Sequence, residues 1–158
     1  MAPDLVAGSV GTEHLPGPVR TLSALPGIDY ADLFTIRTDA AASPEEWARA
    51  MLGNVPSAGQ RFLWRGILGL RLRPGRSPET VAGWRVTGRG PDWVRLEARS
   101  WFLGANLVVL TGGGRVSIGT LLHYERRFGR LVWPPLSGVH RALVPGLLRR
   151  GAARIASR

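Results

Sequence analysis

Hydrophobic and polar residues alternate through the middle of the chain, which is typical of β-strands with one buried face. We expect strands at 81–87, 93–101, 105–111 and 115–125, with a hairpin turn at the three glycines 112–114. The pattern is clearest in 93–101, where the inner face holds Val94, Leu96, Ala98 and Ser100. The four segments predict an antiparallel meander.

A further strand and a helix precede this meander. In residues 30–38, Asp32 shares a face with Phe34 and Ile36, so the alternation directs a carboxylate toward the core. Ser43 begins a helix with the pattern of a capping box, and its apolar stripe ends before Asn54. Residues 57–72 fit a helix or a strand, and we favour a second short helix.

The final segment predicts a long amphipathic helix over 137–154. Pro145 lies within it, so we expect a kink or two helical pieces between Val144 and Leu147. One helical face is expected to carry His140, Leu143, Val144, Leu147 and Leu148.

The order of these elements predicts an α+β fold. A curved antiparallel sheet would wrap around the long C-terminal helix, with two short helices after the first strand. We expect residues 28–158 to form one domain. Residues 1–27 are rich in Gly, Pro, Ala and Ser and predict an N-terminal arm or irregular segment.

The amino-acid composition excludes several kinds of site and segment. The chain has no cysteine, which excludes disulfides, thiolate metal sites and cysteine nucleophiles. It shows neither the pattern of a signal peptide nor a run of about 18 apolar residues. We therefore expect a cytoplasmic protein without a transmembrane segment.

The net charge is +10, and all 21 basic residues are arginine. Most of the arginines are scattered, which is more typical of a solvated surface than of a nucleic-acid footprint. Two dense groups stand at 126–130 and 148–150. We expect no nucleic-acid partner, and we keep binding to nucleic acid or an anionic membrane as a second alternative.

Several short motifs resemble an uncharacterised bacterial family of the START-like, or SRPBCC, superfamily. They span residues 24–154 and comprise 26–32, 44–50, 81–85, Thr120 with 124–127, and 139–141 with Pro145 and 147–149. The resemblance implies a helix-grip fold with a cavity beneath the last helix. Members of the superfamily hold lipids, sterols, quinones or polyketides there, and some act on them. The motifs have no assigned chemistry, so the resemblance transfers no catalytic residue.

His140 and Asp32 are the candidate catalytic residues. An imidazole on the apolar face of the last helix can exchange a proton near neutral pH, and a core-facing carboxylate needs a partner. The two could form a general base with its orienting group. Alternatively, His140 fixes the helix by binding backbone or an inner polar group, and Asp32 lies in water or beside an arginine.

The function predicted is binding of a hydrophobic or amphipathic small molecule, with an enzyme of secondary metabolism as the alternative. A few inward polar groups among apolar ones suit such a pocket, and they can equally be satisfied core residues. Tyr30 and Trp133 could add flat apolar surface. The candidate ligand-binding residues are His140, Leu143, Leu147, Tyr124, Thr120, Trp84, Phe34 and Ser100.

We expect no cofactor and no metal. His123 and Glu125 stand two apart on the outward face of one strand, but two ligands without a third have little metal specificity. The three glycines at 112–114 lack the Lys-Ser/Thr sequence of a phosphate-binding loop.

Overall fold

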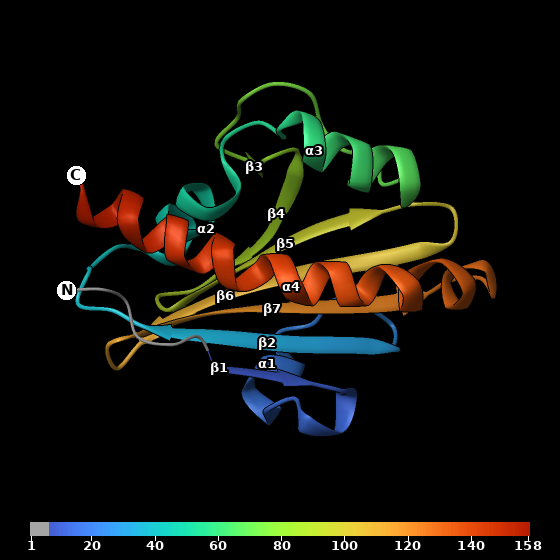
Figure 1. Ribbon diagram of the computed structural model, residues 1–158, viewed down its shortest axis with the longest axis horizontal. Coiled ribbons are helices and arrows are strands. Elements are labelled where there is room, and N and C mark those ends of the chain that lie inside the picture. Colours follow the sequence, from blue (N-terminus) through green and yellow to red (C-terminus); the bar gives the residue numbers. More distant parts are fainter. Residues whose placement is uncertain (1–6) are drawn as a thin grey trace.

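The computed structural model describes residues 7–158. These residues form a seven-stranded antiparallel sheet in the order β1-β2-β7-β6-β5-β4-β3, with a long helix, α4 Phe128–Ala156, lying over one face (Figure 1). The strands are β1 Ala7–Val10, β2 Tyr30–Arg37, β3 Thr80–Val81, β4 Trp84–Arg89, β5 Trp93–Arg99, β6 Leu103–Gly112 and β7 Arg115–Tyr124. This confirms an α+β architecture with an antiparallel sheet and a long C-terminal helix.

The helices lie on both faces of the sheet. They are η1 Thr12–His14, α1 Gly17–Thr21, α2 Pro44–Leu52, α3 Ala58–Arg61, η2 Phe62–Ile67 and α4 Phe128–Ala156. Helices α2 and α4 cover the face whose core includes Phe34, Ile36 and Leu96. A smaller cluster on the other face packs Leu15 and Val19 against strand residues.

The N-terminal segment is part of the sheet, so the expectation of an arm is wrong for the residues described. Strand β1 pairs with β2 from Ala7↔Thr35 to Val10↔Asp32. Leu15 and Val19 are buried behind the sheet. Strand β1 and helices η1 and α1 are four, three and five residues long, which is too short to show a periodic pattern in the sequence. Residues 1–6 of the expected arm lie outside the described residues.

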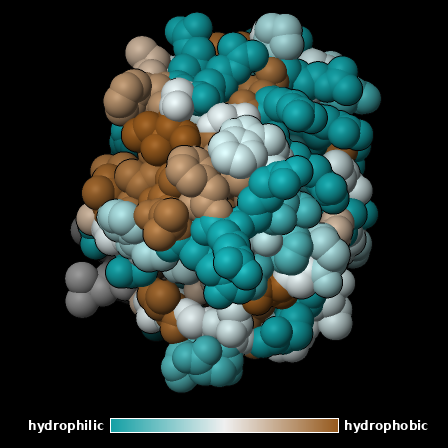
Figure 2. Space-filling model, turned by 90° about the vertical axis from the view of Figure 1, so that its right-hand side faces the viewer, coloured by the Kyte–Doolittle hydropathy of each residue, from teal (hydrophilic) through white to brown (hydrophobic). Residues whose placement is uncertain are grey.

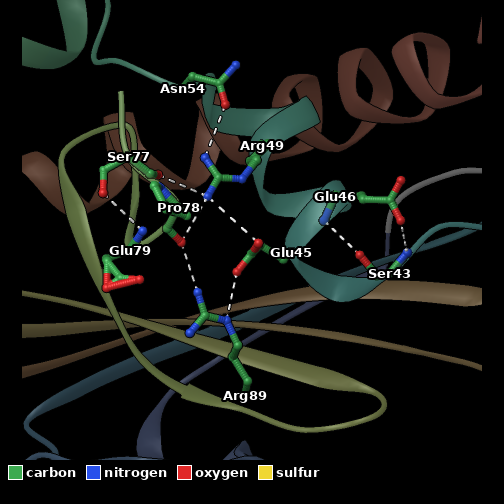
Figure 3. Close-up of polar contacts among 9 residues, drawn as sticks. All are labelled: Ser43, Glu45, Glu46, Arg49, Asn54, Ser77, Pro78, Glu79 and Arg89. Carbon is green, nitrogen blue, oxygen red and sulfur yellow. Dashed lines mark hydrogen bonds and ion pairs between the residues drawn. The ribbon is translucent and has the colours of Figure 1, made fainter. Parts of the chain in front are cut away.

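Helix α2 is held in place by its cap and by two arginines. The capping box at Ser43 and Glu46 is formed as predicted. At the other end Arg49 donates to the Asn54 side chain and to the carbonyls of Ser77 and Pro78. Arg89 of β4 joins the same group by binding Glu45 and the Pro78 carbonyl (Figure 3). These bonds tie the helix to the loop that leads into β3.

Two short helical segments follow β2, as the sequence predicts, and α2 is the first of them. α3 and η2 make one helical stretch over residues 58–67, in which the later part has the wider π-type turn. The strand expected at 81–87 is divided, because Ala82 and Gly83 adopt positive φ angles of 50° and 85° and turn the chain between β3 and β4.

Helix α4 begins nine residues earlier than predicted and runs from Phe128 to Ala156 without a break. Of the predicted kink or two helical pieces between Val144 and Leu147, the two-piece alternative is therefore wrong. Proline at 134, 135 and 145 removes the amide donors that would bind the carbonyls of residues four positions earlier. Packing compensates, since Trp133, Val144 and Leu148 are buried against the sheet and α2. In the same stretch the Ser137 hydroxyl donates to the Pro134 carbonyl.

The face of α4 that meets the sheet also differs from the prediction. Its buried positions include Trp133, Ser137, Val144 and Leu148. Leu143 lies about 100° around the helix from the centre of this face and is 55% exposed, so its assignment to the inner face is wrong. Leu147 is half-buried at the edge of the core.

Candidate functional site

Asp32 is a fully buried carboxylate in the second strand from one edge of the sheet. It lies on β2, next to Thr120 of β7 and on the same face as Phe34 and Ile36. Its exposed fraction is 0%, which confirms the inward orientation that the alternation predicts. A carboxylate in such a place needs polar partners, because an isolated buried charge is strongly destabilising.

Two side chains meet this carboxylate from different elements. The Tyr30 hydroxyl, two residues earlier on β2, donates to Asp32 Oδ2 over 2.6 Å. His140 of α4 places its Nε2 3.0 Å from the same oxygen. The second contact has ion-pair distance without being a hydrogen bond, since His140 Nε2 has no hydrogen-bond partner. The two candidate residues therefore meet. We call Tyr30, Asp32 and His140, together with Trp133, the polar cluster.

The rings of Tyr30, Trp133 and His140 pack against one another within the polar cluster. The Trp133 ring lies 5.2 Å from that of Tyr30 and 5.3 Å from that of His140, measured between centroids. Trp133 is buried, and the side chain of His140 is 18% exposed. Such a site excludes most water while leaving one edge of the imidazole accessible.

The charge state of Tyr30 is fixed by this environment. Burial, followed by the hydrogen bond to Asp32, raises the pKa of the Tyr30 hydroxyl far above its ordinary value. Arg141 is close enough to the hydroxyl to oppose this rise. Tyr30 is therefore a neutral hydrogen-bond donor across the physiological pH range.

The polar cluster contains unsatisfied atoms. Asp32 Oδ1 and Trp133 Nε1 are buried and have no hydrogen-bond partner. A buried polar atom left unpaired costs about 1–3 kcal/mol, so each such atom calls for an explanation. Asp32 Oδ1 is an acceptor and Trp133 Nε1 is a donor. Both atoms belong to residues that contact Tyr30 or His140.

A second histidine–aspartate pair lies where strand β2 begins and strand β7 ends. His123 Nδ1 is 3.0 Å from Asp29 Oδ2, and that carboxylate also accepts from the Tyr124 amide. Both side chains are about a quarter exposed. Burial, then the nearby Asp29 charge, raises the pKa of Tyr124. This pair fastens the segment before β2 to the end of β7.

The other predicted site residues are only partly brought together. Thr120 is buried directly across from Asp32. Phe34 is in the same core, whereas Trp84 packs edge-on against Trp64 at the β4 side of the sheet. The Ser100 hydroxyl accepts from the Phe102 amide and shapes the turn between β5 and β6. Arg141 lies near the Tyr30 hydroxyl and was not predicted as a site residue. Nothing in the sequence distinguishes it from the other scattered arginines.

A pocket of about 440 Å³ lies at the opposite end of β2 and β7 from Tyr30. Its lining comes from residues 38–42, from Trp47 and from the β6–β7 hairpin, and includes Asp39 and Arg115. None of its lining residues belongs to α4. This pocket therefore differs from the cavity expected beneath the last helix, where Val144 and Leu148 pack into the core.

Among residues 7–158 there is no group of three His, Asp or Glu side chains placed to hold a metal ion. His123, one of the two metal candidates, instead faces Asp29. In the same part of the chain, no helix combines the length and the apolar character needed to cross a bilayer.

Comparison with known proteins identifies no family for this chain. No family model, no curated protein and no solved structure matches the chain.

Proposed function

We propose that the protein binds an apolar small molecule bearing a hydroxyl group, at the polar cluster beneath α4. The observation that supports this most is that the polar cluster contains both an unsatisfied buried acceptor, Asp32 Oδ1, and an unsatisfied buried donor, Trp133 Nε1. A hydroxyl donates one hydrogen bond and accepts others, so one group of a ligand can serve both atoms. Sterols, hydroquinones and phenolic polyketides belong to this class.

The surroundings suit the rest of such a molecule. The polar cluster borders the main core, in which Phe34, Trp133 and Val144 present apolar surface. Burial of apolar ligand surface contributes about 25 cal/mol per Å² before the cost of association. The polar groups would fix orientation and select for the hydroxyl.

Entry of the ligand requires local movement of α4. The helical turns around His140 lie between Pro135 and Pro145, each of which removes one backbone hydrogen bond. Fewer backbone bonds lower the free energy of local opening. We propose that this stretch opens to admit the ligand and closes over it. The arrangement of a long terminal helix over an antiparallel sheet also supports the helix-grip resemblance.

The test compares a hydroquinone with its dimethyl ether, which keeps the ring and loses the donor. We expect the hydroquinone to raise the melting temperature more than the ether does. Trp133→Phe should weaken hydroquinone binding about three- to tenfold, the value of one hydrogen bond. Trp84→Phe is the matched control, because Trp84 Nε1 is also buried and unpaired but lies beside Trp64. Equal binding of the two compounds, or equal loss in both variants, would contradict the proposal.

A second candidate is acid–base catalysis on the same ligand. It is favoured by the 3.0 Å contact of His140 with Asp32, which resembles a general base held by an orienting carboxylate. The Tyr30 hydroxyl holds that carboxylate in turn. If the protein is an enzyme, His140→Gln should keep ligand binding and abolish turnover, while His123→Gln should keep both. Turnover that survives His140→Gln would exclude this role.

A further inference from the structure

Helix α4 carries an apolar stripe on the side opposite the sheet. At 100° per residue, Phe128, Leu131, Pro135, Val139 and Ala142 all point within about 40° of one direction. Every one of them is exposed, and Leu143 lies at the edge of the same face. Leu131 is 72% exposed and Val139 54%. We call these six residues the outer stripe.

The outer stripe continues onto the neighbouring turn. Trp101, between β5 and β6, stacks on Phe128 with 5.2 Å between ring centroids and is 55% exposed. Buried Phe102 supports both rings. Figure 2, a view of the end of the molecule where α4 begins, shows apolar residues gathered on one side and bordered by hydrophilic ones. Contiguous apolar surface of this kind marks an interaction site.

Arginines stand at both ends of the outer stripe. Arg126 and Arg127 precede it, and Arg149 and Arg150 follow it on exposed positions of α4. Helix α4 itself contains five arginines and no acidic residue between Phe128 and Ala156. The two dense arginine groups of the sequence therefore mark the two ends of one apolar face.

We propose that this face docks on the surface of an anionic phospholipid bilayer, with α4 lying parallel to the membrane plane. Apolar side chains on one face, arginines around them and an aromatic residue at the edge are the features of interfacial helices. Two copies of this chain would bring together surfaces of the same charge, which disfavours self-association through this face. Nucleic acid would leave the aliphatic side chains of the outer stripe without a role.

The experiment measures co-sedimentation of the ligand-free protein with vesicles. One set contains phosphatidylcholine alone and the other contains phosphatidylcholine with phosphatidylglycerol. We expect binding to the anionic vesicles, weakened by salt and much lower on the neutral ones. The double variant Leu131→Ser/Val139→Ser should weaken binding about tenfold. Val55→Ser is the matched control, because Val55 is 49% exposed on another part of the surface.

Three results would overturn the proposal. The first is no binding to anionic vesicles. The second is binding that the outer-stripe variant leaves unchanged, which would show adsorption through arginine charge alone. The third is a dimer in solution that the same variant dissociates, because a second copy would then cover the face. Melting curves of the variants check that they fold. The assay contains no small-molecule ligand, so its outcome is independent of the function proposed above.

Discussion

The Asp32 carboxylate and the His140 imidazole meet across the boundary between strand β2 and helix α4, with Oδ2 and Nε2 3.0 Å apart. The two residues are more than a hundred positions apart in sequence. Their contact places a polar pair within an apolar core and joins the last helix to strand β2. Asp29 and His123 repeat the same distance in a more exposed setting, which provides an internal comparison.

The Asp32–His140 pair and the Asp29–His123 pair should differ in coupling free energy. A double-mutant cycle of Asp32→Asn with His140→Gln should give about 0.5–3 kcal/mol, because neither side chain is well solvated. The cycle of Asp29→Asn with His123→Gln should give about 0–1 kcal/mol. Both are measured by urea denaturation at about pH 5.5, where a free imidazole is mostly protonated. Equal couplings would show that burial of Asp32 adds nothing to its contact with His140.

The two tyrosines should resist ionisation in the folded protein. The pKa of Tyr30 and that of Tyr124 are both raised, chiefly by burial. The folded state therefore holds more protons than the unfolded state above about pH 10, where free tyrosine ionises. Stability is unaffected below that pH and falls as the pH rises through it.

Tyrosinate absorbance during alkaline titration checks this prediction. The signal should appear only well above pH 10 in the native protein and near pH 10 in denaturant. Tyr30→Phe should remove most of the alkaline loss of stability. Native titration of Tyr30 at the ordinary pH would show that its hydroxyl is not buried against Asp32.

Stability near pH 4 should depend on Glu46. The Ser43 amide, followed by Arg158, lowers the pKa of this carboxyl. The folded state thus binds fewer protons, so the contribution of Glu46 is present above the ordinary glutamate pKa and is lost as the pH falls through the folded value. Glu46→Gln should flatten the stability profile in this window, measured by thermal melts from pH 3 to 6 (about one unit either side of the ordinary pKa). An unchanged profile would contradict the cap geometry.

Two glycines of α4 should respond oppositely to alanine. A Cβ at Gly151 would lie 2.6 Å from Met51 Cγ of α2, whereas a Cβ at Gly138 meets nothing within 4 Å. Gly138→Ala should stabilise the protein by about 0.5–1 kcal/mol through helix propensity. Gly151→Ala should destabilise it by about 1–3 kcal/mol through overpacking. A gain in both variants, measured by denaturant unfolding, would show that α2 and α4 are not closely packed there.

The sequence predicts the centre of this fold well because its signals there are local. Alternation places Asp32 inward beside Phe34, and the glycines at 112–114 close the β6–β7 hairpin. The capping box at Ser43 marks the start of α2. Each of these depends on residues close together in the chain.

The incorrect predictions concern elements whose position depends on packing between distant parts of the chain. Strand β1 has four residues and is defined by its pairing with β2, which no local pattern reveals. Helix α4 has apolar residues around most of its circumference, so Leu143 and Val144 could not be told apart by periodicity. The contact between His140 and Asp32 could be proposed but not predicted, because the sequence does not specify the position at which α4 packs along β2.

The most direct test of the account follows the six indole N–H signals of the tryptophans by NMR during titration with a hydroquinone. Assignment comes from single Trp→Phe variants. We predict that the Trp133 signal shifts strongly, that the Trp84 and Trp101 signals stay in place, and that Asp32→Asn reduces the shift. A Trp133 signal that does not move at saturating hydroquinone, or that moves equally in Asp32→Asn, would contradict a ligand site at the polar cluster.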